Sequence, residues 1–214
     1  MEKLVSNWFN DQALPQSYIF PPETRPGNHT IPGCSTIPVV DLSKASGLDR
    51  TGIVQQILKA SREFGFFQVV NHGVSENLVN DTMNLFKEFF QLPAEDKASG
   101  DVSGLQVYRD GEWIGVEPLH NAFVVNIGHQ LQIISNNKLK SAEHRAVTNS
   151  EVARTTAAFF IYPSDDCIIE PVKSLIDTDE SPAYRAFRFK EFQLNYVSRI
   201  GNPEESLEPF KLHV

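Results

Sequence analysis

The chain has 214 residues, of which 41% are hydrophobic and 21% are charged, and its 15 phenylalanines are enough to build a core. These proportions are those of an ordinary globular protein with one large or two small domains. The formal net charge is −8, and no basic cluster interrupts it. Binding to nucleic acid or to an anionic membrane surface is therefore not expected. A small-molecule enzyme or a protein-binding module fits better.

The first residues give no sign of a targeting segment. Charged and amide side chains interrupt every apolar stretch of MEKLVSNWFNDQ, which therefore lacks the core of a signal peptide. The longest apolar runs, such as 157–161, are too short to span a bilayer. Cys34 and Cys167 could pair with each other, but two free or buried thiols in a reducing compartment fit better. We therefore predict a cytoplasmic protein.

The first part of the chain predicts an extended arm followed by mixed α and β structure. Residues 1–36 are rich in proline and are expected to run as an arm over the surface. TIPVVDLS, at 36–43, predicts a short buried strand. Apolar residues then recur at helical spacing from Ile53 to Phe64, and Gly65 predicts the end of that helix.

A second strand and a second helix complete this part. FFQVVNHG, at 66–73, predicts a strand that ends in a turn, and Ser75 is placed to cap the helix that follows. Pro93 predicts the end of that helix. Its expected apolar face consists of Leu78, Thr82, Leu85, Phe86 and Phe89. Residues 37–99 are therefore predicted to form one mixed N-terminal domain.

The pattern changes near Ser99–Asp101. From there to about residue 172 no helical periodicity is visible, and short apolar runs alternate with turn residues, as in an antiparallel sandwich or barrel. The predicted strands are LQVYR (105–109), EWIGVEP (112–118), AFVVNIG (122–128), LQIIS (131–135), AEHRAVT (142–148) and RTTAAFFIYP (154–163). The C-terminal tail, 173–214, is predicted to contain one helix within 183–199.

The histidines are the first candidates for metal ligands. An iron(II) oxygenase needs two histidines and one carboxylate on one face of its site. Two of these ligands commonly come from His-x-Asp or His-x-Glu on a strand, because residues i and i+2 point the same way. None of the six histidines has an acidic residue two positions away, and no HExxH or CxxC motif is present. The residues alone therefore show no complete metal site.

Residues 141–160 hold the most informative pattern. His144 precedes Arg154 by ten residues, and Arg154 and Thr156 would share one face of a strand. An arginine fork beside a hydroxyl suits the binding of a carboxylate. The alternative is that His144 is a barrel histidine whose ring nitrogens bond to neighbouring protein groups, and that Arg154 is a surface or ion-paired arginine. Without knowledge of a family, the residues favour this alternative. His72, in the NHG turn, is expected to be structural and bonded to backbone.

Longer segments resemble the plant 2-oxoglutarate-dependent, iron(II) dioxygenases. TIPVVDLS, ILKASREFGFFQVVNHGVSENL and FKEFFQLPAEDK resemble their N-terminal domain. DVSGLQVYRDGEWIGVEPLHNAFVVNIG and SNNKLKSAEHRAVTNSEVARTTAAFF resemble the middle and the end of their jelly-roll domain. The two ends of the chain resemble most the branch that includes hyoscyamine hydroxylase and deoxymugineic acid dioxygenase.

The resemblance implies an α+β fold in which the N-terminal domain precedes an incomplete jelly roll, or double-stranded β-helix, at 101–172. It implies that His144 is the distal iron ligand and that Arg154 pairs with the far carboxylate of 2-oxoglutarate. Thr156 stands where the family usually has serine and keeps the hydroxyl. The implied cofactors are Fe(II) and 2-oxoglutarate, with ascorbate as reductant, and the implied partner is a small-molecule substrate. The oligomeric state is not indicated.

One departure from the family bears directly on activity. Relatives have a long block between the counterparts of Ser99 and Asp101, which holds the His-x-Asp motif, a tyrosine that contacts the co-substrate and the first barrel strands. This chain lacks that block, so the resemblance assigns it no catalytic residue. His129 and Asn137 also stand where many relatives have Asp and Gly.

A single imidazole does not hold iron(II) in a defined geometry. The loss of one residue that bonds to a metal ligand already lowers the affinity for the metal about 10–100-fold, and the loss of ligands themselves costs more. We therefore expect an inactive or severely impaired descendant of enzymes that hydroxylate or desaturate small specialised metabolites. The alternatives are a catalytically dead ligand- or protein-binding module, and an unstable fragment produced by a splice event or a gene-model error. Open sheet edges left by missing strands would support the last alternative.

If the chain is an exon-skipped product, its gene contains a coding block between the codons of Ser99 and Asp101. Sequencing the gene and its transcripts across this junction tests the hypothesis. Exon skipping predicts a longer transcript or an intact exon at this place. A gene in which the two codons are contiguous would refute it.

Overall fold

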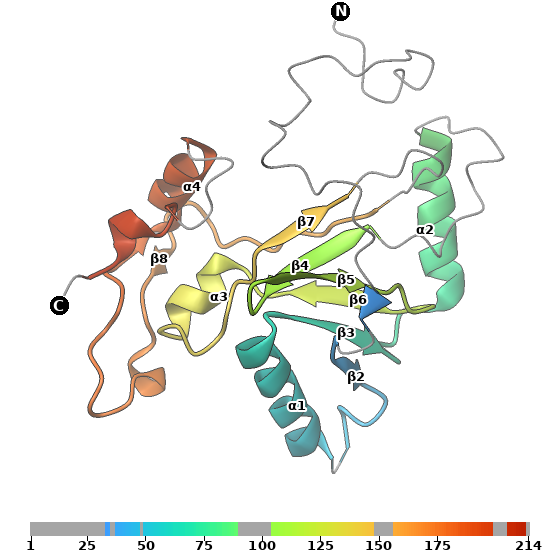
Figure 1. Cartoon of the computed structure of the whole chain (residues 1–214), viewed down its shortest axis with the longest axis horizontal. Helices are drawn as coiled ribbons and strands as arrows, with labels where there is room; N and C mark the ends of the chain where they lie inside the picture. The colour runs from blue at the N-terminus through green and yellow to red at the C-terminus, as the bar shows by residue number, and fades with distance from the viewer. Residues whose placement is uncertain are drawn as a thin grey trace, which may run out of the picture.

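The computed structural model describes residues 33–34, 37–47, 49–89, 104–147, 156–198 and 205–212. Two small sheets lie at the centre, with helix α1 (Arg50–Glu63) beside them and helix α2 (Glu76–Phe89) at one end (Figure 1). A C-terminal unit that contains helix α4 (Phe189–Ser198) lies at the opposite end (Figure 1). Mixed helices and sheets of this kind agree with the predicted α+β class.

The first sheet has the order β2-β3-β6, with β2 at Val39–Asp41, β3 at Phe66–Val70 and β6 at Phe123–Asn126. Strands β2 and β3 are parallel and are joined by α1, because a parallel pair needs a crossover connection. Strand β6 pairs antiparallel with the other edge of β3. The strands predicted at 36–43 and 66–73 and the helix between them are thereby confirmed.

The second sheet has the order β1-β5-β4-β7. Its strands are β1 (Gly33–Cys34), β4 (Leu105–Arg109), β5 (Glu112–Val116) and β7 (His144–Ala146). Asp110 and Gly111 join β4 to β5 with φ values of 52° and 89°, the two positive angles that a tight two-residue hairpin requires. The strands predicted at 105–109, 112–118 and 142–148 are confirmed.

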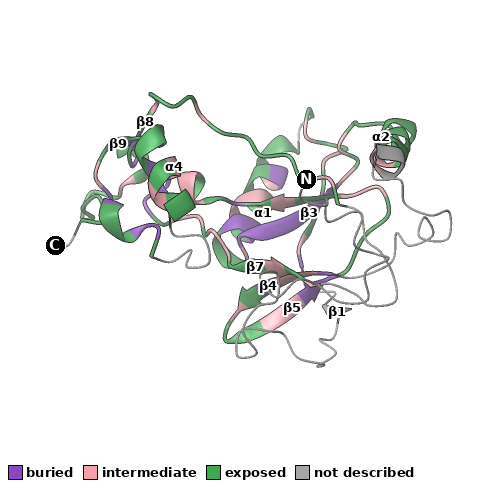
Figure 2. Cartoon of the chain, turned by 90° about the horizontal axis from the view of Figure 1, so that it is seen from above, coloured by how far each residue is buried: buried purple, intermediate pink, exposed green. Residues whose placement is uncertain are grey.

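Strand β3 connects the layers because both of its faces are buried (Figure 2). Phe66 packs between the two sheets, in a cluster with Ile37, Val107 and Val116. On the opposite face Phe67 and Val69 pack in a cluster with residues of β2 and α1. The resulting order of layers is α1, the β2-β3-β6 sheet and the β1-β5-β4-β7 sheet.

The C-terminal unit has its own core. It contains β8 (Ile168–Ile169), β9 (Phe187–Arg188) and two short 3-10 turns at Lys173–Leu175 and Glu208–Phe210. The core cluster consists of Ile133, Ile169, Tyr184, Phe187, Phe189, Phe192, Leu207 and Phe210. The helix predicted within 183–199 is confirmed from Phe189 onward. The residues before it are extended, because Phe187 and Arg188 pair with β8.

Two predicted strands were wrong. Residues 131–135 lie largely in helix α3 (His129–Ile134), which follows the extended Gly128 and buries Ile133 completely in the C-terminal core. A short apolar run of this kind fits a buried helical turn as well as a strand. In the run predicted at 154–163, the described residues 156–163 are not paired as a strand.

Helix α2 begins as predicted but does not bury its predicted apolar face. The backbone N–H of Leu78 donates to Ser75 Oγ at 3.3 Å, which confirms the cap. Leu78 and Leu85 are nevertheless exposed, and Figure 2 shows the described part of α2 as exposed and intermediate residues. Most of the predicted arm at 1–36 and the whole Ser99–Asp101 junction lie outside the described residues.

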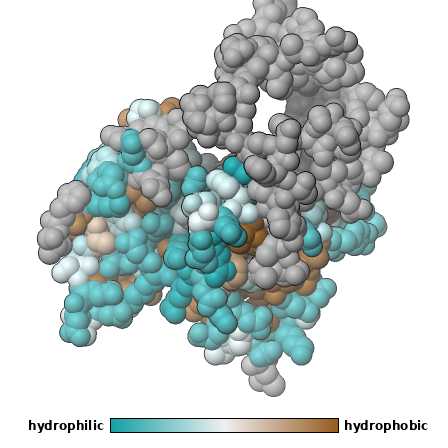
Figure 3. All heavy atoms as spheres, viewed as in Figure 1, coloured by the Kyte–Doolittle hydropathy of each residue, from teal (hydrophilic) through white to brown (hydrophobic). Residues whose placement is uncertain are grey.

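Among the residues that are coloured in Figure 3, most of those on this face are hydrophilic, and a group of hydrophobic side chains reaches the surface between them. This distribution agrees with a chain of net charge −8. Within the described part of the chain, no helix is long and apolar enough to cross a membrane.

Gly65 has φ +69°, and a Cβ at this position would lie 2.7 Å from the Lys140 carbonyl oxygen and 3.0 Å from the Ala142 nitrogen. We predict that Gly65→Ala lowers the free energy of unfolding by both the left-handed backbone cost of about 1–2 kcal/mol and an overpacking cost of about 1–3 kcal/mol. Urea unfolding measures the loss.

Gly111→Ala is the matched control, because Gly111 has φ +89° and open space around its Cβ position. It should show the backbone cost alone. If both variants lost the same free energy of unfolding, the close approach of residues 140–142 to Gly65 would be contradicted.

Candidate functional site

His144 lies on edge strand β7, at the margin of the space between the two sheets. The β4–β7 register pairs Val107 with His144 and Leu105 with Ala146. Successive strand residues point to opposite faces, and the His144 ring meets the Phe66 ring edge-on at a centroid distance of 5.1 Å. His144 therefore lies on the side of β7 that faces β3, although the residue itself is exposed.

A backbone carbonyl fixes the orientation of the His144 ring. Nδ1 lies 3.1 Å from the carbonyl oxygen of Ala142. Because a carbonyl only accepts hydrogen bonds, Nδ1 carries the proton and donates it, which leaves a lone pair on Nε2. Metal-binding histidines are commonly oriented by a second bond of this kind. The geometry therefore suits His144 to act as one metal ligand through Nε2.

The opposite face of β7 is held by Arg145. Its Nε donates to Gln106 Oε1 at 2.7 Å, and its guanidinium lies 3.9 Å from the centroid of the Trp113 ring. A stacked, hydrogen-bonded arginine of this kind restrains the strand that carries His144.

His129, at the start of α3, is the second imidazole in this region. Its ring makes edge contacts with Phe192 and Tyr196 at centroid distances of 6.0 and 6.1 Å. Burial lowers the pKa of His129 below its ordinary value, and an electrostatic interaction with His144 lowers it further. His129 is therefore neutral at pH 7. The sequence identified it only as a departure from the family.

Of the other two predicted site residues, the structure describes only Thr156. Thr156 is described and exposed, and no bond joins it to His144 in the described part of the chain. Arg154 lies outside the described residues, so its proximity to Thr156 remains a prediction. Among the described residues, no three His, Cys, Asp or Glu side chains are grouped in a way that could hold a metal ion. The described residues therefore do not fit an iron centre that needs three protein ligands.

His72 has the structural role that was predicted. Its Nε2 donates to the Asn121 carbonyl oxygen at 3.0 Å, and its Nδ1 accepts the Val74 N–H at 3.3 Å. The ring also stacks on Phe123 at a centroid distance of 4.2 Å. Both ring nitrogens are thus used, and none is left to bind a metal. Cys167 is a free thiol, as expected.

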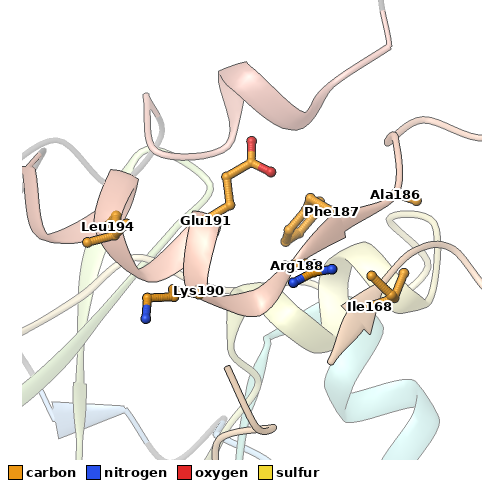
Figure 4. Close-up of a pocket in the computed structure, with 7 residues that line it drawn as sticks. All are labelled: Ile168, Ala186, Phe187, Arg188, Lys190, Glu191 and Leu194. Carbon is orange, nitrogen blue, oxygen red and sulfur yellow. The ribbon is translucent and has the colours of Figure 1, made fainter. Parts of the chain in front are cut away.

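A surface depression of about 550 Å³ lies on the C-terminal unit, between β8, β9 and α4 (Figure 4). Ile168, Phe187 and Leu194 line it, and the charged ends of Lys190 and Glu191 point away from each other in Figure 4. None of the residues that line this depression belongs to β7, the strand that carries His144.

Because the pKa of His129 is lowered in the folded chain, the unfolded chain binds more protons as the pH falls through about 6.5. We predict that stability is highest above this pH and declines below it as His129 becomes protonated. Urea unfolding between pH 5 and 8 should show the decline, and His129→Gln should reduce it.

NMR titration of the His129 ring is the direct measurement. His144→Gln should raise the pKa of His129, because it removes one of the two causes of the lowered value. A His129 pKa at or above its ordinary value in the unmodified chain would contradict the described packing.

Comparison with known proteins agrees with the resemblance seen in the sequence. The model of the non-haem dioxygenase N-terminal family, described from morphine synthesis, matches residues 37–155, which is more than half of the chain. The 2'-deoxymugineic-acid 2'-dioxygenase of Hordeum vulgare is 27% identical over 323 residues, covering 89% of this chain and 92% of that protein. The DMR6-like oxygenase 2 of Arabidopsis thaliana is 45% identical over 113 residues, 52% of this chain and 32% of that protein.

A solved structure shows the same fold. The crystal structure of JOX2 in complex with 2OG, Fe and JA superposes with a TM-score of 0.74 at 23% identity and covers 95% of both chains. The alignment with the Hordeum enzyme is longer than this chain of 214 residues, so a long stretch of that enzyme has no counterpart here. The family match, the relatives and the shared fold together show that this chain belongs to the non-haem, 2-oxoglutarate- and iron(II)-dependent dioxygenase family.

Proposed function

We propose that this chain is a family member that has lost the turnover of 2-oxoglutarate. The observation that supports the proposal is His144, an imidazole oriented by Ala142 with its Nε2 available, and without two further ligand side chains grouped around it in the described residues. Family ancestry accounts for the orientation of this histidine, and the incomplete ligand set accounts for the loss.

The coordination chemistry explains why one histidine is insufficient. A facial triad of two histidines and one carboxylate holds iron(II) and leaves three positions for co-substrate and oxygen. Iron held in this way supplies the oxidation of a substrate C–H bond, coupled to conversion of 2-oxoglutarate to succinate. Replacing an outer contact of a metal ligand already costs about 10–100-fold in affinity, and the loss of two ligands costs more. His129 does not replace them, because it is half-buried against Phe192 and Tyr196.

The sheets support the same proposal. We propose that strands β4, β5, β6 and β7 are the remaining part of a jelly roll at 101–172, which is joined to the N-terminal domain at 37–99 and followed by the tail at 173–214. In the described part of the chain, β6 ends one sheet and β7 ends the other, so each sheet has an edge at which further strands could pair. The stretch of the Hordeum enzyme without a counterpart here is consistent with a block absent between Ser99 and Asp101.

The second candidate is a binding module that has kept the co-substrate end of the site. The favouring observation is the Arg154-x-Thr156 spacing in the sequence together with the exposure of Thr156. An arginine and a hydroxyl could bind a carboxylate without iron. The ligand class would be 2-oxoglutarate or another small carboxylic acid.

Succinate release tests the first proposal. The purified chain is supplied with Fe(II), 2-oxoglutarate and ascorbate in air, beside its His144→Ala variant and a full-length relative. We expect succinate only from the relative, with this chain at the level of its variant. Succinate formed by this chain and abolished by His144→Ala would refute the loss of turnover.

Calorimetry with 2-oxoglutarate, in the absence of metal, separates the second candidate from the first. A binding module predicts heat that disappears in Arg154→Ala and remains in Thr156→Ser, which keeps the hydroxyl. Absence of any heat would eliminate that candidate and leave the first proposal intact.

A further inference from the structure

Residues 156–162 form an uncharged, strongly exposed segment, TAAFFIY. The exposed fractions are 79% for Phe159, 71% for Phe160, 97% for Ile161 and 60% for Tyr162. Four consecutive large apolar or aromatic residues at this exposure are unusual on a chain that functions alone, because contiguous apolar patches mark interaction surfaces.

The segment already has strand-like geometry. The rings of Phe160 and Tyr162 are stacked at a centroid distance of 5.8 Å with only 2° between their planes. Side chains two residues apart share a face only when the backbone is extended. Phe159 and Ile161 therefore belong to the opposite face.

The backbone of this segment is open for pairing. Among the described residues, no backbone hydrogen bond and no strand partner involves residues 156–162. The composition is that of strongly pairing segments, with β-branched and aromatic residues, no charge and no glycine, and the first proline at Pro163. In Figure 1 this part of the chain is a trace without an arrow.

The carboxyl end of the segment is fixed to the folded core. The Tyr162 ring lies 5.8 Å from the ring of Phe189, which is almost completely buried in the C-terminal unit. The segment is thus presented at a defined place, and pairing there costs less ordering entropy than pairing of a free tail.

We propose that two copies of this chain associate by antiparallel pairing of residues 156–162. An antiparallel pair of identical segments has two-fold symmetry, which is the commonest arrangement of homodimers. Cross-strand aromatic and β-branched pairs would then stabilise the contact.

Charge favours a second copy in this orientation. Two chains of net charge −8 repel each other, so an uncharged surface is the best place for them to meet. In the sequence, Arg154 precedes the segment, and Asp165 and Asp166 follow it. Asp165 is paired with Lys190 at 3.6 Å, so the negative charge at this end comes mainly from Asp166. An antiparallel arrangement brings ends of opposite charge together, whereas a parallel arrangement would bring like charges together.

Sedimentation velocity of the full chain over a range of concentrations tests the proposal. We expect a concentration-dependent dimer for the unmodified chain and a monomer for Ile161→Lys, because a lysine at each copy's segment adds repulsion and removes apolar contact. Leu85→Lys is the matched control, since Leu85 is 64% exposed on α2, and it should dimerise normally. Circular dichroism should be unchanged in both variants, because neither side chain is buried.

Hydrogen exchange locates the contact. Amides of residues 156–162 should exchange more slowly as the protein concentration rises, and Ile161→Lys should abolish this dependence. The proposal is overturned by a chain that stays monomeric throughout, by a dimer that Ile161→Lys leaves intact, by protection confined to other residues, or by open-ended polymers in place of a dimer. No metal or co-substrate enters this experiment, so its outcome is independent of the proposed loss of turnover.

Discussion

The two buried faces of strand β3 are the constraint on which the rest of the structure depends. Phe67 and Val69 fix α1 on one face, and Phe66 fixes the second sheet on the other. The edges of β3 are also occupied, by β2 and β6. Removing a buried phenylalanine typically costs about 3–5 kcal/mol. Each of these contacts is therefore a substantial fraction of the net stability of a domain, which is about 5–15 kcal/mol.

The orientation of His144 follows from this arrangement and does not require a metal. Phe66 provides an aromatic surface for the imidazole, and the Ala142 carbonyl sets its tautomer. The segment that leads to β7 is held against α1, because the Lys140 N–H donates to the Ser61 carbonyl oxygen at 3.1 Å. The contacts around His144 are therefore sufficient to orient its ring without a bound metal ion.

Local patterns in the sequence predicted the elements that depend on local chemistry. Gly65 was predicted to end a helix, and its positive φ angle suits few residue types. The strands at 105–109 and 112–118 were predicted from the turn residues that separate them, and the structure joins them through Asp110 and Gly111, both with positive φ. Residues 131–135 were mispredicted for a different reason. A short apolar run becomes a helix or a strand according to the partner that buries it, and for Ile133 that partner is the C-terminal core, which is distant in the sequence. The run at 156–163 is extended, but it has no strand partner in the described part of the chain.

The candidate site was predictable only in part. The sequence and the family resemblance identified His144, and the structure orients it. The contact of Phe66 with His144 and the packing of His129 against Phe192 and Tyr196 could not be predicted, since both join elements that are distant in the sequence. The expected role of Arg154 remains a prediction, because it lies outside the described residues.

The central claim is that this chain keeps the family fold without a site that holds iron. An anaerobic thermal melt, with and without Fe(II) and 2-oxoglutarate, tests it most directly. A ligand at a hundredfold excess over its dissociation constant stabilises the native state by about 2.7 kcal/mol, which a melt readily detects. The account predicts a cooperative transition at the same temperature in both conditions. A saturable upward shift that His144→Ala abolishes would show that an iron site survives, and would contradict it.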